Sequence, residues 1–286
     1  MARTQTKTLL LASLLAASLA ASNAAEPGKE IVPGVRLVAR ISDPRIKESS
    51  GVVASRRYTN VYWTHNDGGG PKKQVLYTID REGNTRASFP VIDVTLDDWE
   101  DIAMDDAGHL YIGDIGNNDS KRDTLAVYEI DEPNPQAGAG PVSPKRAWKL
   151  KFPEAAFDCE SLFVWKDQGY VVSKVFDKAR AQIFRFPLKE TNRPLTLELV
   201  ATTKIESPVT GADISADGRL LGVVAKNGAY VFRIDGDVAH VTQTKPHHTK
   251  LKNMHIEGCC FVPEGLLATS ERRMIFLFND PAFRGE

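Results

Sequence analysis

Five short hydrophobic segments recur along the chain, and their starts lie roughly fifty residues apart. Each segment begins directly after a small or acidic residue. The clearest copies span residues 99–103, 159–163 and 256–260, and two divergent copies span residues 49–53 and 209–213. A period of about fifty residues built from short strands is typical of propeller blades. The repeat therefore predicts an all-β fold, a five-bladed β-propeller.

Glycine turns support the alignment of the copies. In three of them the residue at the repeat position lies eight residues before a glycine, and a second hydrophobic segment follows that glycine. These pairs are Glu100 with Gly108, Thr210 with Gly218, and Glu257 with Gly265. The same register in successive copies favours blades in which two short strands are joined by a tight turn.

The last repeat is incomplete. It supplies three strands, at residues 258–262, 266–270 and 274–278, and a spare strand at residues 35–41 precedes the first repeat. We expect this early strand to fill the outer position of the fifth blade, which would remove an exposed sheet edge. The outer strands of the third and fourth blades are expected at residues 195–205 and 238–244.

The N-terminus resembles a secretory signal. Arg3 and Lys7 precede an apolar run at residues 9–21, and small residues follow up to Ala24. The run is shorter than the roughly twenty residues that a membrane span requires. We predict a signal peptide at residues 1–24, no membrane span, export to a periplasm or the exterior, and a single propeller domain at residues 25–286.

Charge and cysteine content narrow the possible partners. The formal net charge is −1, and no basic run or nucleic-acid-binding module is present, so nucleic acid is not an expected partner.

The three cysteines, Cys159, Cys259 and Cys260, fall on or beside predicted innermost strands. We interpret them as buried small hydrophobic residues, although one pairing with Cys159 stays open. We expect a monomer.

The repeat places one residue of each blade at an equivalent point near the axis. Three carboxylates gathered there repel one another unless a cation neutralises them. Calcium accepts six to eight oxygen ligands in flexible geometry, whereas zinc prefers histidine and cysteine. The alternative is that the glutamates cap strand amides or bond to one another as acids. The predicted ligands of a calcium ion are Ser50, Glu100, Glu160, Thr210 and Glu257.

The loops after the second strand of each blade are expected on the same face as this ring. They are polar and charged, as binding or catalytic loops often are, although turns favour Asn, Asp and Gly for conformational reasons alone. The candidate catalytic or ligand-binding residues in these loops are His65, Asp67, Asp114, Lys174, Lys226, Glu271 and Arg272.

These motifs carry a resemblance to known families. Residues 256–260, followed by 265–271 and 274–278, resemble a repeat of the β-propeller phytases, and residues 99–103 with 108–112 are similar. The order of ring residues is similar to that of calcium-centred five-bladed apyrases. Residues 50–52 and 60–63 resemble exported SdiA-regulated and esterase-like propellers. The resemblance implies a propeller with a calcium ion.

Three functions remain open from the sequence. The favoured one is an exported calcium-binding propeller whose loop face binds a small-molecule or protein ligand. The resemblance to phytases and apyrases implies a calcium-dependent hydrolase of phosphate esters or anhydrides, with Lys174, Lys226 and Arg272 as phosphate-binding candidates. However, the loops lack a dense basic cluster. A lactonase or esterase is the third. His65 with Asn66, Asn117 and Asn118 would suit it, because neutral amides together with calcium can hold a carbonyl oxygen.

Overall fold

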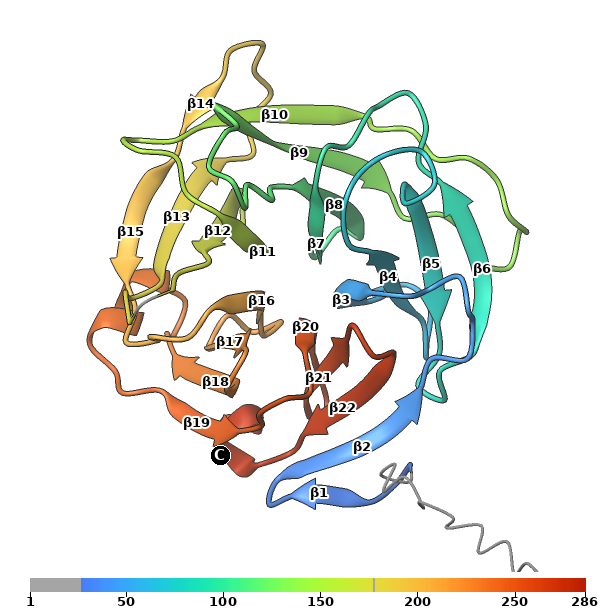
Figure 1. The fold of residues 1–286 in the computed structure, drawn as a ribbon, viewed down its shortest axis with the longest axis vertical. Coiled ribbons are helices and arrows are strands. Elements are labelled where there is room, and N and C mark those ends of the chain that lie inside the picture. The colour runs from blue at the N-terminus through green and yellow to red at the C-terminus, as the bar shows by residue number, and fades with distance from the viewer. Residues whose placement is uncertain (1–26, 177) are drawn as a thin grey trace, which may run out of the picture.

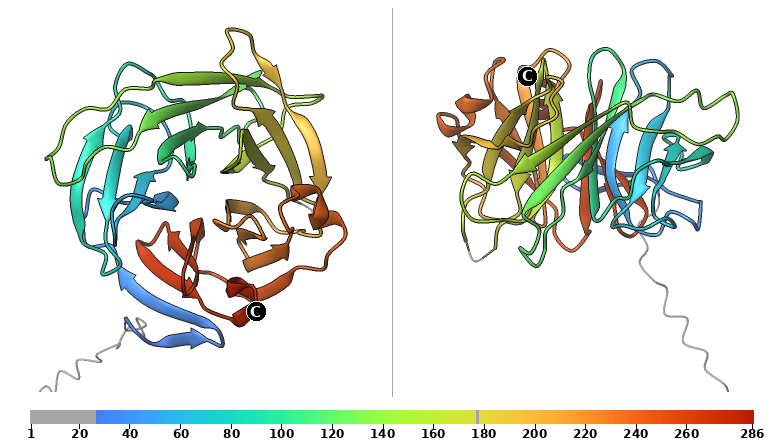
Figure 2. Two further views of the ribbon diagram at one scale, coloured as in Figure 1. Left: turned by 180° about the vertical axis from the view of Figure 1, so that it is seen from behind. Right: turned by 90° about the horizontal axis from the view of Figure 1, so that it is seen from above.

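Five β-sheets in the described residues are arranged as blades around a central axis (Figure 1). The computed structural model describes residues 27–176 and 178–286. The predicted signal peptide, residues 1–24, lies outside the described residues. The predicted five-bladed β-propeller is confirmed, and Figure 2 shows the ring from behind and from the side.

Each blade has four strands in antiparallel order from the axis outward. The innermost strands are β3 (Ser49–Ala54), β7 (Trp99–Met104), β11 (Cys159–Trp165), β16 (Val209–Ile214) and β20 (Ile256–Val262). The second strands are β4 (Tyr62–Asn66), β8 (His109–Asp114), β12 (Gln168–Ser173), β17 (Leu220–Ala225) and β21 (Gly265–Ser270). The third strands are β5 (Val75–Ile79), β9 (Thr124–Asp131), β13 (Gln182–Pro187), β18 (Gly228–Arg233) and β22 (Met274–Phe278). The outer strands are β6 (Thr85–Pro90), β10 (Arg146–Lys151), β15 (Glu198–Thr202), β19 (His247–Lys250) and β2 (Val35–Arg40).

The N-terminal strand closes the ring. Strand β2 pairs with β22 along its length, so the first and last segments of the domain share one sheet (Figures 1 and 2). A further short strand, β1 (Glu30–Val32), lies outside β2. The predicted completion of the fifth blade by an early strand is confirmed. This pairing covers an edge of β22 that would otherwise be unpaired.

Every innermost strand is irregular at the predicted ring position. Glu100, Glu160 and Thr210 are each an extra residue without a counterpart on the second strand. Ser50 and Glu257 fall within equivalent shifts of register. A bulge re-aims the side chain of the extra residue and bends the strand. The repeated sequence position is therefore a repeated β-bulge at the axis.

The hydrophobic core lies mainly between neighbouring blades. One cluster, for example, packs Trp63 and Phe89 of the first blade against Trp99 and Leu110 of the second. At the axis the innermost strands come so close that Gly258 has no room for a side chain. A Cβ atom there would overlap the carbonyl oxygen of Ser50 on the neighbouring strand. This close approach explains why glycine follows the ring residue in that blade.

Two predicted outer strands differ from the structure. Residues 238–244 were expected as a strand but begin with a 3-10 helix, η1 (Val238–Thr242), and the outer strand is β19 further along the chain. The Asp237 side chain accepts the Ala239 N–H and so favours the helical turn. The segment 195–205 divides, because β14 (Leu195–Thr196) pairs with β10 of the second blade before β15 joins its own sheet. A second 3-10 helix, η2 (Pro281–Arg284), ends the domain.

The cysteines are buried and unpaired. Cys159, Cys259 and Cys260 are free thiols packed in hydrophobic clusters, which confirms their interpretation as small hydrophobic residues. Within residues 27–176 and 178–286, the structure contains no helix of the length and apolarity that crossing a membrane requires.

Candidate functional site

A polar pocket of about 180 Å³ lies at the end of the axis where the innermost strands begin. It is lined both by residues of the ring position and by residues of the loops after the second strands. The first set is Ser50, Glu100, Glu160 and Glu257, and the second is Asp67, Asn118, Lys174, Lys226 and Glu271, with Glu48 beside them. The structure thus brings together four of the five predicted ring residues and four of the seven loop candidates.

The two hydroxyl residues of the ring bond to neighbouring strands. Ser50 Oγ donates a hydrogen bond to the carbonyl oxygen of Glu100 at 2.6 Å. Thr210 Oγ1 donates to the carbonyl oxygen of Ile256 at 2.8 Å, and Thr210 is buried. Both bonds join one innermost strand to the next. These hydroxyls therefore stabilise the closure of the ring.

A lysine stands close to the axis and pairs with one ring glutamate. Lys174 Nζ forms an ion pair with Glu160, and it lies 4.0 Å from Asp158 Oδ2. The Lys174 side chain is only 9% exposed. The lysine also lowers the pKa of the Glu100 and Glu257 carboxyls, against the larger effect of burial. An internal ammonium group thus supplies part of the positive charge that we predicted calcium would supply.

Glu257 shares a hydrogen bond with another acid. Burial, followed by the hydrogen bond and repulsion from Glu271, raises the Glu257 pKa to about 8, although Lys174 and Lys226 lower it. A buried carboxyl with a pKa of about 8 keeps its proton at neutral pH and can donate it in this hydrogen bond to Glu271. The proton on Glu257 removes the charge repulsion between Glu257 and Glu271, so this pair does not require a metal ion.

Glu100 instead belongs to a group of three carboxylates. Ligand atoms of Asp67, Asp98 and Glu100 all lie within 4.8 Å of one another. Burial is the main cause that raises the pKa of each carboxyl. Repulsion within the group adds to it for Asp67 and Glu100, and repulsion from Asp158 and Asp114 adds to it for Asp98. In the part of the chain that the structure describes, no hydrogen bond or ion pair is made by these three carboxylates. We call this group the acidic cluster.

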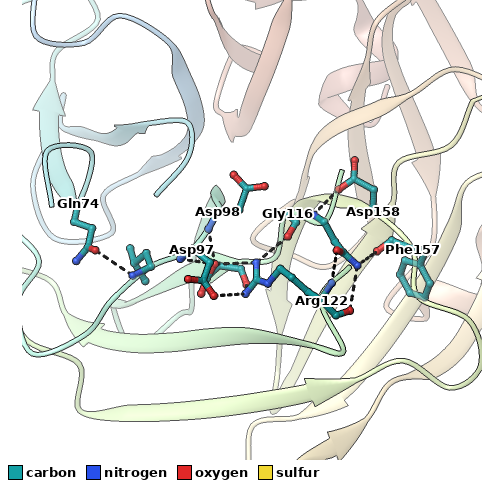
Figure 3. Close-up of polar contacts among 10 residues, drawn as sticks. Gln74, Asp97, Asp98, Gly116, Arg122, Phe157 and Asp158 are labelled. Carbon is teal, nitrogen blue, oxygen red and sulfur yellow. Dashed lines mark hydrogen bonds and ion pairs between the residues drawn. The ribbon is translucent and has the colours of Figure 1, made fainter. Parts of the chain in front are cut away.

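The main chain around the cluster is held by a buried network (Figure 3). Asp114 Oδ1 accepts the N–H groups of Asp97 and Asp98 and pairs with Arg122 at 3.0 Å. Arg122 also donates to the carbonyl oxygen of Gly116 at 2.7 Å. Figure 3 shows no dashed line at the Asp98 carboxylate. The network therefore fixes the Asp98 backbone, while the Asp98 carboxylate has no hydrogen bond or ion pair with any residue that the structure describes.

Two details show that the cluster is closely packed against the backbone and lies beside an unmet polar group. A Cβ atom at Gly116 would overlap carboxylate oxygens of Asp98 and Glu100. Asp158 joins the network through Oδ1, which accepts a hydrogen bond from the Asn117 N–H at 2.8 Å. Its other oxygen, Oδ2, is buried and has no hydrogen-bond partner among the described residues. Buried polar atoms are nearly always satisfied, so an unmet oxygen here requires an explanation.

Three loop candidates lie outside the pocket. His65 is fully buried, stacks on Trp99 at 4.0 Å and accepts the Gly51 N–H, and burial lowers its pKa to about 3. It is a neutral packing residue. Asp114 belongs to the network beneath the cluster. Arg272 donates toward His255, which pairs with Glu271 at 3.1 Å.

Sequence reasoning missed Asp98. The signal was present, since Asp97 and Asp98 directly precede the clearest repeat copy. Only the bulge at Glu100 turns the Glu100 side chain toward the Asp98 and Asp67 carboxylates. The assembled cluster offers hard oxygen donors only, which suit calcium or magnesium rather than zinc.

The fold and pocket define the protein as a five-bladed β-propeller with an acidic pocket at one end of its axis. No protein-family profile and no curated protein matches the sequence. Solved structures that it resembles include a chain of a nidogen/laminin complex, with TM-score 0.47, 13% identity, and coverage of 79% of this chain and 73% of that one. Another is hydrazine synthase of Kuenenia stuttgartiensis, with TM-score 0.42, 14% identity, and coverage of 78% and 56%. A third is an inactive variant of virginiamycin B lyase from Staphylococcus aureus with quinupristin, with TM-score 0.43, 13% identity, and coverage of 82% and 67%.

Proposed function

We propose that the protein binds a calcium ion through Asp67, Asp98 and Glu100, and that its loop face uses this ion to hold a ligand. The observation that carries the proposal is the acidic cluster, whose carboxylates lack a hydrogen bond or ion pair within the described residues. Burying ionised carboxylates together is costly unless a cation joins them. The signal-like N-terminus leads us to propose that the protein acts after export.

The proposed ligand set differs from the ring expected from sequence. Glu160 pairs with Lys174, Glu257 bonds to Glu271, and the Ser50 and Thr210 hydroxyls bond to neighbouring strands. Glu100 alone among the ring residues lacks such a partner in the described structure. We therefore place the cation beside the axis, at the junction of the first and second blades.

The geometry suits calcium. Calcium–oxygen distances are about 2.3–2.6 Å, so two ligands on opposite sides of the ion lie up to about 5 Å apart. The three carboxylates, within 4.8 Å of one another, meet this condition. Asp158 Oδ2, which is buried and has no hydrogen-bond partner among the described residues, adds negative charge to the same region beside Asp98 and Glu100.

Calcium titration of the mature protein by calorimetry tests the proposal. We expect binding by the wild type and at least a roughly hundredfold weaker affinity in Asp98→Asn, since a ligand carboxylate contributes several kcal/mol. The matched control is Asp106→Asn, an exposed residue on the turn that joins β7 to β8. No calcium binding by the wild type, or equal affinities in the two variants, would refute the proposed site.

A calcium-dependent hydrolase is the second candidate function. The observation that favours it is the hydrogen bond between Glu257 and Glu271, with the Glu257 pKa raised to about 8, in the pocket that also contains Glu100 and Asp67. A calcium ion would polarise a bound carbonyl or phosphoryl oxygen, and the Glu257–Glu271 pair could donate a proton to the leaving group. A panel of esters, lactones and phosphate esters, assayed with calcium and with chelator, would show whether calcium-dependent turnover exists and whether Glu257→Gln removes it.

A further inference from the structure

The pocket has a large excess of negative charge. Among the described residues its lining has six carboxylates and two ammonium groups, which leaves a formal charge of −4. Asp98 and Asp158 lie beside the lining, as does Lys73 at the rim, and together they bring the total to −5. One calcium ion and one proton on Glu257 reduce it to −2. A site that still has this charge with its metal bound repels anions.

The lysines do not offset this excess. Lys174 is committed to Glu160 and lies near Asp158. The positive charge of Lys226 lowers the pKa of the Glu257 carboxyl, and Lys226 Nζ lies 6.0 Å from the centre of the Phe176 ring. Lys73, at the rim, pairs with Glu48 at 3.6 Å. Lys174 and Lys73 therefore each have a carboxylate partner that an incoming phosphate would have to displace, whereas Lys226 forms no ion pair with a described carboxylate and acts on Glu257 only at longer range.

The pocket still offers hydrogen-bond donors to an uncharged ligand. The Asn118 amide and the two lysines can donate to a carbonyl or hydroxyl oxygen, and the many carboxylates can accept from hydroxyl groups. The volume of about 180 Å³ equals roughly six water molecules at about 30 Å³ each. Phe176, 53% exposed and adjacent to both lysines, presents an apolar ring next to this polar space.

We infer that the pocket takes a small neutral molecule with carbonyl or hydroxyl oxygens, such as an ester, a lactone or a polyol, and rejects phosphate esters and other polyanions. Like charges held in a poorly solvated site are an effective means of excluding the wrong ligand. The inference rests on the proposed calcium site and distinguishes between the two hydrolase chemistries that the sequence left open. It favours the carbonyl substrate over the phosphoryl one.

Ligand-observed NMR on the calcium-loaded mature protein tests the inference. The probes are δ-valerolactam, a neutral lactone analogue that resists hydrolysis, and methyl phosphate, a small anion. We expect saturation transfer to the lactam, and we expect methyl phosphate to bind about tenfold more weakly or not to compete. Tighter binding of methyl phosphate, or binding of neither probe, would overturn the inference.

A charge variant makes the test independent of absolute affinity. Glu48→Gln removes one lining carboxylate and releases Lys73, so the affinity for methyl phosphate relative to the lactam should rise at least several-fold. The matched control is Glu264→Gln on the turn between β20 and β21, at the opposite end of the blade, where no change in this ratio is expected. An unchanged ratio in Glu48→Gln would contradict the electrostatic argument. Calcium titration of the same samples separates this failure from failure of the calcium site itself.

Discussion

Replacing Glu100 by glutamine is expected to raise stability in the absence of calcium and to abolish the stabilisation that calcium provides. Glu100 is 4% exposed, and burial followed by repulsion from Asp67 and Asp98 raises its pKa. Within residues 27–176 and 178–286, its carboxylate makes no hydrogen bond. Without calcium, the wild type must therefore tolerate either a repelled charge or a proton taken up above the normal pKa. Glutamine removes this cost, and it also removes a calcium ligand.

The size of the effect can be bounded. Two charges 4.8 Å apart repel by about 3.5 kcal/mol at an effective dielectric constant of about 20. Protonation limits the cost, because holding a proton at pH 7 on a group with a normal pKa of 4.5 costs about 3 kcal/mol. The calcium-free variant should therefore gain up to about 3 kcal/mol, or several degrees in Tm. In calcium at about a hundred times Kd, the wild type gains about 2.7 kcal/mol that the variant lacks.

Thermal unfolding at pH 7 in chelator and then in calcium measures both effects. We expect Glu100→Gln to melt above the wild type in chelator and to show little or no rise on addition of calcium. The control is Glu129→Gln, since Glu129 is equally buried but pairs with Arg146. That control should lower Tm under both conditions because it leaves a charge without its partner. If Glu100→Gln melts below the wild type in chelator, the assumed repulsion in the acidic cluster is wrong.

Three further changes test other parts of the structure. Gly116→Ala should weaken calcium binding at least tenfold by calorimetry, because its Cβ overlaps oxygens of Asp98 and Glu100, and normal binding would show that the cluster has more space than described. Ser50→Ala should lower the free energy of unfolding by about 1 kcal/mol while leaving the calcium-induced shift in Tm intact, and a smaller shift would identify Ser50 as a ligand. For Glu257, whose pKa of about 8 exceeds its normal value of 4.5, stability is greatest at low pH and is lost as the pH rises toward 8. Glu257→Gln should therefore flatten this decline in urea unfolding across pH 5 to 8, and identical slopes would contradict the raised pKa.

The architecture was predictable because each blade repeats the same pattern of short strands and turns. The spacing of Glu100, Glu160 and Glu257 gave the number of blades, and the spare early strand indicated how the ring closes. Each of the five innermost strands in the structure also lies at one of the five repeat copies found in the sequence. The outer strands were less predictable, since they pack on one side only. Asp237 was sufficient to replace an expected strand with the 3-10 helix η1.

The position of the pocket in the fold could be predicted from the sequence, but the roles of its residues could not. Sequence order put the ring residues and the loops after the second strands on one face. It could not show that Lys174 reaches Glu160, because that contact depends on how a long side chain folds back over the axis. It also could not show which carboxylates meet, since the bulge at Glu100 decides that Asp98 and Asp67 are its neighbours.

The most direct test of the calcium site is a crystal structure of residues 25–286 soaked in calcium, with anomalous data collected at long wavelength. The proposed site predicts an anomalous peak in contact with carboxylate oxygens of Asp67, Asp98 and Glu100, and a Lys174 that still pairs with Glu160. A peak on the axis between Glu160 and Glu257, or no peak near the acidic cluster at saturating calcium, would contradict it.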